Sequence, residues 1–112
     1  MNIAEFRDYC IKKEDVEETF QFGQETLVFK ITGKMFLFSG INGHPVQFNV
    51  KCDPEKALEL RADHPNVLPG YHMNKKHWNT VVCDGSVSKK MLLQWIDDSY
   101  DLVAKKKTSP RK

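Results

Sequence analysis

Hydrophobic residues follow two different periods along this chain of 112 residues. In residues 46–51, for example, valine and phenylalanine alternate with glutamine, asparagine and lysine. Alternation of this kind is typical of a strand in an antiparallel sheet with one covered face. We therefore expect strands at residues 26–32, 34–39 and 46–51, and Gly33 should join the first two as a hairpin.

Helical spacing marks three other segments. Asn2 is a favourable N-cap for a first helix, and the Asp-Pro-Glu sequence that begins at residue 53 is a strong helix start. The second helix should end before Pro65, because a residue that precedes proline avoids helical geometry. The last helix keeps the 3.6-residue period over four turns and is capped by Ser86 or Ser88. The expected helices therefore span residues 2–13, 53–64 and 86–104.

Two shorter strands complete the prediction, at residues 66–73, where Pro69-Gly70 breaks the pattern, and at residues 78–83. Residues 14–24 read as a polar connection, with a short extended piece near residues 17–20 as an alternative. The predicted fold class is a two-layer α+β domain, in which an antiparallel sheet of about five strands packs against helices. The order along the chain is one helix, three strands, one helix, two strands and one helix.

Length and composition indicate one ordinary globular domain, since 40% of the residues are hydrophobic and 29% are charged. We expect residues 1–104 to form this domain. No apolar run approaches the roughly 18 residues that span a bilayer, and the first residues lack the pattern of a signal peptide. A cytoplasmic location is the resulting expectation, together with three free thiols at Cys10, Cys52 and Cys83.

Charge is distributed unevenly along the chain. Residues 105–112 hold five basic residues and no acidic one, and we expect them to form a disordered tail. The remaining 104 residues hold 12 basic and 15 acidic residues. Residues 26–79, however, hold seven basic and four acidic residues together with all four histidines. The middle of the chain is therefore a basic segment within an acidic domain.

Residues 69–80 are the densest stretch of side chains that both hydrogen-bond and stack. Lysine and histidine beside tyrosine and tryptophan combine positive charge for phosphates with rings on which bases stack. Asparagine has both a donor and an acceptor for base edges. With the lysines of the neighbouring strands, the candidate nucleic-acid-binding residues are Lys30, Lys34, Lys51, Asn74, Lys75, Lys76, His77 and Asn79.

Other chemistry has less support in the sequence. His72 and His77 are five residues apart, a spacing that suits neither one helical face nor one strand face, so we expect no metal site. A Cys83–His77 pair lacks the surroundings of an activated nucleophile, and no phosphate-binding or dinucleotide motif is present. We therefore expect neither an enzyme nor a cofactor.

A protein-interaction module is the alternative function. In that interpretation Tyr71 and Trp78 are interface anchors, and the exposed sheet face receives a partner or a second copy of the chain. The expected oligomeric state is a monomer or a weak dimer.

The sequence resembles the MmcQ/YjbR family of small bacterial proteins in blocks that fall in order along nearly the whole chain. These blocks are Val28-Phe29-Lys30, Gly33-Lys34-Met35-Phe36, Val50-Lys51-Cys52-Asp53-Pro54, residues 69–81 and Ser99-Tyr100-Asp101-Leu102-Val103. The resemblance implies a two-layer α+β fold with an antiparallel sheet. It also implies a role in binding double-stranded DNA through paired hairpins, without an established reaction.

Overall fold

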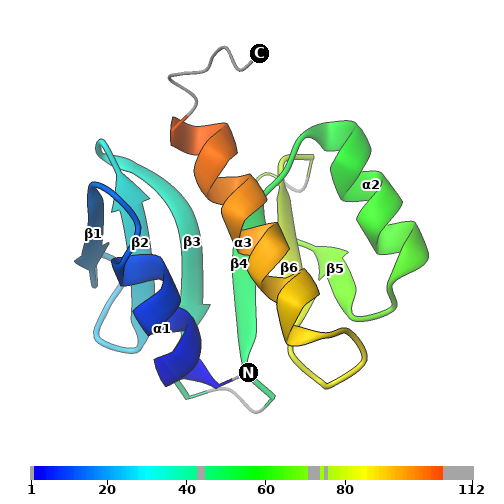
Figure 1. Ribbon diagram of the computed structural model, residues 1–112, viewed down its shortest axis with the longest axis horizontal. Helices are drawn as coiled ribbons and strands as arrows, with labels where there is room; N and C mark the ends of the chain where they lie inside the picture. Colours follow the sequence, from blue (N-terminus) through cyan, green and yellow to red (C-terminus); the bar gives the residue numbers. More distant parts are fainter. Residues whose placement is uncertain (1, 43–44, 71–73, 75, 105–112) are drawn as a thin grey trace.

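The computed structural model describes residues 2–42, 45–70, 74 and 76–104. Six antiparallel strands form one sheet, and three helices lie on one face of it (Figure 1). The elements are α1 (Ile3–Ile11), β1 (Val16–Thr19), β2 (Thr26–Ile31), β3 (Lys34–Gly40), β4 (Gln47–Lys51), α2 (Pro54–Asp63), β5 (Val67–Pro69), β6 (Trp78–Val82) and α3 (Lys89–Ala104). The predicted α+β class is confirmed. The expected tail of residues 105–112 lies outside the described residues.

The sheet has the order β1-β2-β3-β4-β6-β5, so β1 is an edge strand that the expected count of five left out. Its residues occupy the alternative extended piece of the polar connection, shifted by one residue. Glu17 and Glu18 lie on this edge, and charged side chains discourage pairing with another chain. In the part of the chain that the structure describes, no helix is long and apolar enough to cross a membrane.

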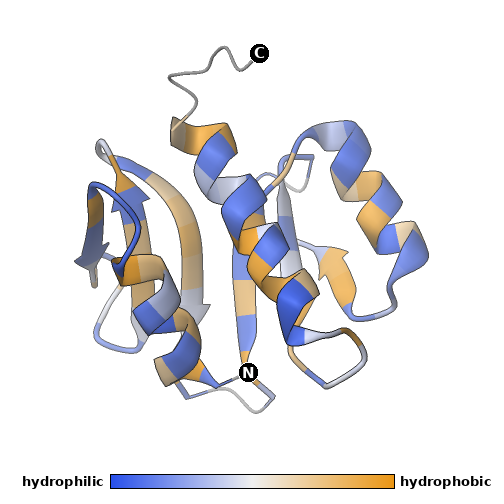
Figure 2. Cartoon of the chain, viewed as in Figure 1, coloured by the Kyte–Doolittle hydropathy of each residue, from blue (hydrophilic) through white to orange (hydrophobic). Residues whose placement is uncertain are grey.

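One hydrophobic core fills the space between the sheet and all three helices. Each helix contributes one apolar side: Figure 2 shows hydrophobic and hydrophilic residues alternating along α3. The core contains Phe6 and Cys10 from α1, Ala57 and Leu60 from α2, Leu92, Trp95 and Ile96 from α3, and Leu27, Phe29, Phe48 and Val50 from the strands. Burial of these side chains is the main force that holds the two layers together.

The helix starts follow the local sequence only in part. Asn2 forms a capping box with Glu5, and the Ser88 hydroxyl accepts a hydrogen bond from the N–H of Met91. Ser88, and not Ser86, is therefore the residue that caps α3. Asp53 precedes α2 as expected, but its side chain makes no capping hydrogen bond, and Pro54 occupies the first turn instead.

Strands β3 and β4 form a seam in which side chains replace part of the backbone ladder. The register of this pair contains Leu37 opposite Val50 and Phe38 opposite Asn49. At one end of the seam the buried Ser39 hydroxyl donates to the carbonyl of Gln47 (2.7 Å). Buried polar groups need hydrogen-bond partners, so this bond supplies a donor to the carbonyl of Gln47 beyond the last paired residues of β3 and β4.

At the other end of the seam, a residue of α3 joins the two strands. The hydroxyl of Ser99 donates to the carbonyl of Phe36 (2.5 Å) and accepts from the N–H of Lys51 (2.8 Å). Ser99 is fully buried. Helix α3 therefore fixes the end of β4 relative to β3.

Candidate nucleic-acid interface

Two of the candidate lysines lie on the sheet face that the helices leave open. Phe29 pairs with Leu37, and Leu37 pairs with Val50, so these three residues form one row across the sheet. Lys30 and Lys51 each follow this row by one residue, and both face away from the helices because side chains alternate along a strand. The fold thus brings together two lysines that are 21 positions apart in the sequence.

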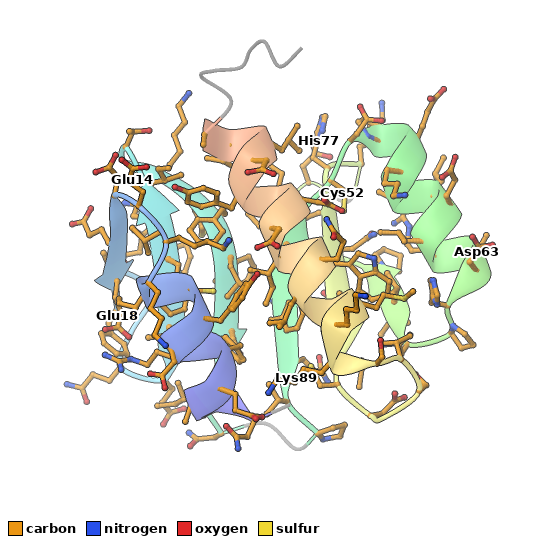
Figure 3. The ribbon with its side chains drawn as sticks, viewed as in Figure 1. Glu14, Glu18, Cys52, Asp63, His77 and Lys89 are labelled. Atoms are coloured by element: carbon orange, nitrogen blue, oxygen red, sulfur yellow. The ribbon has the colours of Figure 1, made fainter. Side chains whose placement is uncertain are left out.

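Three more candidates lie at the same end of the sheet. Lys34 is exposed at the hairpin that joins β2 and β3, while Lys76 and His77 immediately precede β6. Figure 3 shows His77 at the end where α2 begins and α3 ends, with Lys89 at the opposite end. We call the side chains Lys30, Lys34, Lys51, Lys76 and His77 the basic end of the sheet.

A turn at Asn74 presents Lys76 and His77. The side-chain oxygen of Asn74 accepts from the N–H of Lys76 (2.9 Å), and its carbonyl accepts from the N–H of His77 (3.0 Å). The carbonyl of His77 in turn accepts from the N–H of Cys52, which ties the turn to the end of β4. Asn74 therefore shapes the turn, and among the described residues its side-chain N–H₂ group has no hydrogen-bond acceptor. Lys75 lies outside the described residues.

Asn79 does not belong to this surface, contrary to the expectation from sequence. It is completely buried, and its side-chain nitrogen donates to the carbonyl of Ala57 (3.3 Å) in α2. The reason is strand parity: Asn79 pairs with Val50 and faces the helices. Its role is to join β6 to α2 across the core.

Trp78 faces the open side of the sheet but is not exposed. Only 6% of its surface is accessible, because it packs with Val28, Phe38 and Met35 in a second apolar cluster. The rings of Phe38 and Trp78 are 5.6 Å apart between centroids. This burial removes Trp78 as a stacking platform or interface anchor, while Tyr71 lies outside the described residues.

The lysines of the basic end carry their charge in partly or fully accessible positions. Among the described residues, none of Lys30, Lys34, Lys51 and Lys76 forms an ion pair within 4.0 Å. Glu17 on β1 pairs with Lys30 in the register and reduces the positive potential at that edge. Lys51 lies opposite Trp78 in the register, so no acidic residue of β6 is paired with it.

The three cysteines have the properties of structural thiols. Burial raises the pKa of Cys10 to about 12 and the pKa of Cys52 and of Cys83 to about 11, so all three are neutral near pH 7. In the described part of the chain, no group of three His, Cys, Asp or Glu side chains is placed to hold a metal ion. His72 lies outside that part, so the expected absence of a His72–His77 site stays a prediction.

Comparison with known proteins decides the family. The family model YjbR matches residues 11–102 of the chain. The chain belongs to the YjbR family. Among its relatives, the uncharacterized protein YbdF of Escherichia coli O157:H7 is 45% identical over 89 residues, which cover 79% of this chain and 72% of YbdF. The uncharacterized protein YjbR of E. coli K12 is 32% identical over 101 residues, which cover 89% of this chain and 85% of YjbR.

Solved structures of similar proteins have the same fold. The crystal structure of the Deinococcus radiodurans protein DR2400 matches with a TM-score of 0.89 and 40% identity, over 96% of this chain and 82% of that chain. A crystal structure of a Pseudomonas syringae protein matches with a TM-score of 0.76 and 32% identity, over 92% of this chain and 99% of that chain. The resemblance identified from sequence blocks is therefore confirmed for family and fold.

One cation near the basic end, Lys56, was not among the candidates predicted from the sequence. Lys56 lies in the first turns of α2 and lines a groove together with Lys51. Lys56 belongs to the basic segment of residues 26–79, so its charge was visible in the sequence. Its position in a helix, however, does not predict which end of the sheet the side chain lies near.

Proposed function

We propose that this chain binds double-stranded DNA through the basic end of the sheet, without catalysing a reaction. The observation that carries the proposal is the sheet register, which places Lys30 and Lys51 on one face of the sheet, at the end where Lys34, Lys76 and His77 also lie. None of these lysines forms an ion pair with a described residue, and such ammonium groups exchange small counterions for DNA phosphates, so that the release of those ions drives binding.

The proposed contacts are to the DNA backbone. Lysine is a flexible point charge that contacts phosphates without reading sequence. The amide N–H₂ of Asn74 and the ring of His77 lie beside these lysines and would contact sugar or base edges. Since the residues before the tail hold more acidic than basic side chains, the attraction is local to this end, and binding should be weak and strongly dependent on salt.

The test is a titration of duplex DNA at two salt concentrations. The variant Lys34→Gln/Lys76→Gln should bind more weakly, and its slope of log K against log salt should be smaller by about 2, since each lost phosphate contact removes about 0.9. Both side chains are exposed, so the fold should be unchanged. The control Lys89→Gln/Lys90→Gln makes the same charge change at the opposite end of the sheet.

The basic tail needs a separate arm in the same experiment. A variant with glutamine at Lys105, Lys106, Lys107, Arg111 and Lys112 measures the tail's own attraction to DNA. If the tail variant loses all DNA binding while Lys34→Gln/Lys76→Gln loses none, the folded domain is not the DNA-binding part and the proposal is wrong.

A protein-interaction role is the second candidate. Phe20 and Phe22 are 48% and 53% exposed, and the Phe22 ring rests edge-on against Phe38 on the open face of the sheet (6.2 Å between centroids). Exposed aromatic rings are common interface anchors. Under this alternative, Phe22→Ser abolishes partner binding that tolerates high salt, whereas Lys34→Gln/Lys76→Gln leaves that binding unchanged.

A further inference from the structure

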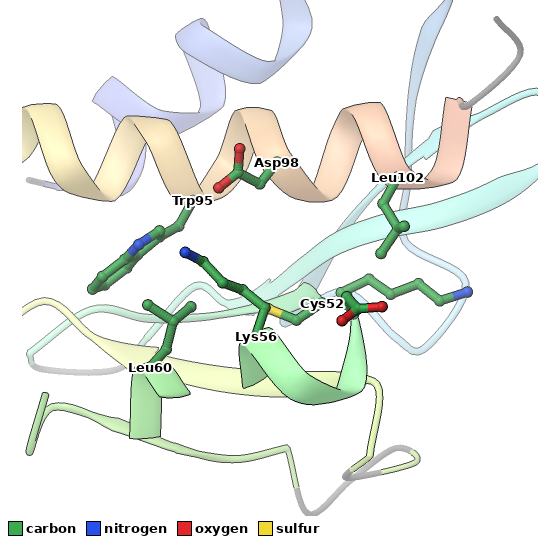
Figure 4. Close-up of a pocket in the computed structure, with 8 residues that line it drawn as sticks. Cys52, Lys56, Leu60, Trp95, Asp98 and Leu102 are labelled. Atoms are coloured by element: carbon green, nitrogen blue, oxygen red, sulfur yellow. The ribbon is translucent and has the colours of Figure 1, made fainter. Parts of the chain in front are cut away.

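A groove between α2 and α3 has the features of a small-molecule site. Its volume is about 350 Å³, which is in the lower range of ligand pockets. Cys52, Leu60 and Trp95 form the floor, and Leu102 lies toward one end (Figure 4). Each floor residue is at most 9% exposed, so the floor is a fixed part of the core surface.

The floor is apolar and rigid. The Trp95 ring is held edge-on by the ring of His64, with 5.1 Å between centroids. Burial keeps the Cys52 thiol protonated, with a pKa of about 11, so the floor carries no charge near pH 7. A flat apolar group would lie against such a surface with little loss of protein freedom, because the floor side chains are already ordered.

Charges of both signs flank this floor. Lys56 extends from α2 toward α3, and its ammonium lies between Trp95 and Asp98 in Figure 4. One Asp98 oxygen accepts from the side-chain nitrogen of Gln94 (2.9 Å), and the other oxygen accepts from none of the described residues. Within the described residues, neither Lys56 nor Asp98 forms an ion pair within 4.0 Å.

The charged residues that line the groove indicate which class of ligand it would bind. Lys51 and Asp53 add one charge of each sign, so two lysines and two aspartates line the groove. A groove with no net charge does not favour phosphates or other simple anions. A molecule with both a carboxylate and an ammonium would satisfy Lys56 and Asp98 together.

We propose that the α2–α3 groove binds a small aromatic zwitterion of the amino-acid type. Its ring lies on Trp95 and Leu60, its carboxylate accepts from Lys56, and its ammonium donates to Asp98. The proposal does not rest on DNA binding, because none of these four contact residues is a proposed DNA contact, although Lys51 of the basic end also lines the groove.

Nuclear magnetic resonance of the full-length chain tests the proposal with three matched compounds. L-phenylalanine carries both charges, 3-phenylpropionate only the negative one, and phenethylamine only the positive one. L-phenylalanine should shift the backbone amide signals of Cys52, Lys56, Trp95 and Asp98, with a Kd on the order of millimolar for so small a ligand. The two singly charged compounds should bind more weakly.

Substitutions at two exposed residues, Lys56 and Asp98, test the two charges of the groove one at a time and leave the core unchanged. Lys56→Gln should weaken L-phenylalanine and 3-phenylpropionate but not phenethylamine, and Asp98→Asn should weaken L-phenylalanine and phenethylamine but not 3-phenylpropionate. A lost charge-assisted hydrogen bond corresponds to about a tenfold rise in Kd. Lys90→Gln and Asp63→Asn are controls outside the groove, and they should leave all three affinities unchanged.

Three outcomes would overturn the proposal. The first is no shift of the groove amides at tens of millimolar compound (a range set by the expected affinity). The second is a set of shifts elsewhere on the domain. The third is equal binding of 3-phenylpropionate and L-phenylalanine, which would make the site one for simple anions.

Discussion

The backbone N–H of Lys51 donates a hydrogen bond to the hydroxyl of Ser99 across 2.8 Å, so helix α3 holds the strand end that carries a proposed DNA contact. The same hydroxyl donates to Phe36 of the neighbouring strand. One buried side chain therefore connects β4, which carries Lys51, to β3, which begins at Lys34.

Replacing Ser99 should weaken the whole domain. Ser99→Ala leaves the N–H of Lys51 and the carbonyl of Phe36 without their partner, and an unsatisfied buried group costs about 1–3 kcal/mol. Urea denaturation should show a loss of this size in the free energy of unfolding. Ser86→Ala removes an exposed hydroxyl that bonds Asp84, and it should change stability by less than about 0.5 kcal/mol. Equal losses in the two variants would contradict this role of Ser99.

Gly70 is required by its contact with Trp78. A Cβ at position 70 would lie 2.8 Å from both the Cβ and the carbonyl oxygen of Trp78. Because one of these atoms belongs to the backbone of β6, the clash cannot be relieved by rotating a side chain. Gly70→Ala should therefore destabilise the domain by about 1–3 kcal/mol, as overpacking does. At Gly40 the nearest atom to an added Cβ is 3.9 Å away, so Gly40→Ala is the matched control and should cost much less in thermal unfolding.

Asn79 should contribute to the stability of the domain and not to DNA binding. Asn79→Ala removes a fully buried amide and its hydrogen bond to Ala57, so we expect the free energy of unfolding to fall by about 1–3 kcal/mol. At a temperature where the variant is still folded, its affinity for duplex DNA should match that of the unsubstituted chain. If the Asn79→Ala protein is folded but no longer binds DNA, Asn79 is part of the DNA interface and this prediction is wrong.

Stability should fall in alkaline solution through Cys10. Its folded pKa is raised to about 12, above the ordinary 9.0, because burial disfavours the thiolate. The folded state therefore retains a proton that the unfolded state loses, and this contribution is complete below pH 9 and declines from pH 9 toward 12. The decline from Cys10 is at most about 1.4 kcal/mol per pH unit. Urea unfolding at pH 7.5 and 10 should show a smaller difference for Cys10→Ala than for the unsubstituted chain.

Patterns in the sequence predicted the elements whose periodicity is strong. The alternation before Lys51 and the four-turn repeat of α3 each place the apolar residues on one side of the element, although Asn49 on the other side of β4 is buried as well. The edge strand β1 has no such division, since Val-Glu-Glu-Thr presents one apolar residue and gains its structure from pairing with β2. Whether so short a segment forms a strand depends on its tertiary contacts, and these contacts cannot be read from the local sequence.

Strand β6 shows why the candidate site could be predicted only in part. Hydrophobic patterning would bury Trp78 on the helix side and expose Asn79, but the register does the opposite. A second apolar cluster covers the tryptophan, and a carbonyl of α2 accepts a hydrogen bond from the side-chain nitrogen of the asparagine. Neither partner is near in sequence. The lysines were found because charge is visible in the chain, whereas their common end depends on the strand order.

The position of α3 has a consequence for how the chain acquires its structure during synthesis. The ribosome makes β1, β2 and β3 first, then β4, β5 and β6, and the helix that bridges the β3–β4 seam through Ser99 comes after all of them. Until α3 has left the exit tunnel, the two strand groups lack the serine bridge and the apolar side of this helix. We expect a nascent chain without α3 to remain sensitive to proteases and to become resistant only once that helix has emerged.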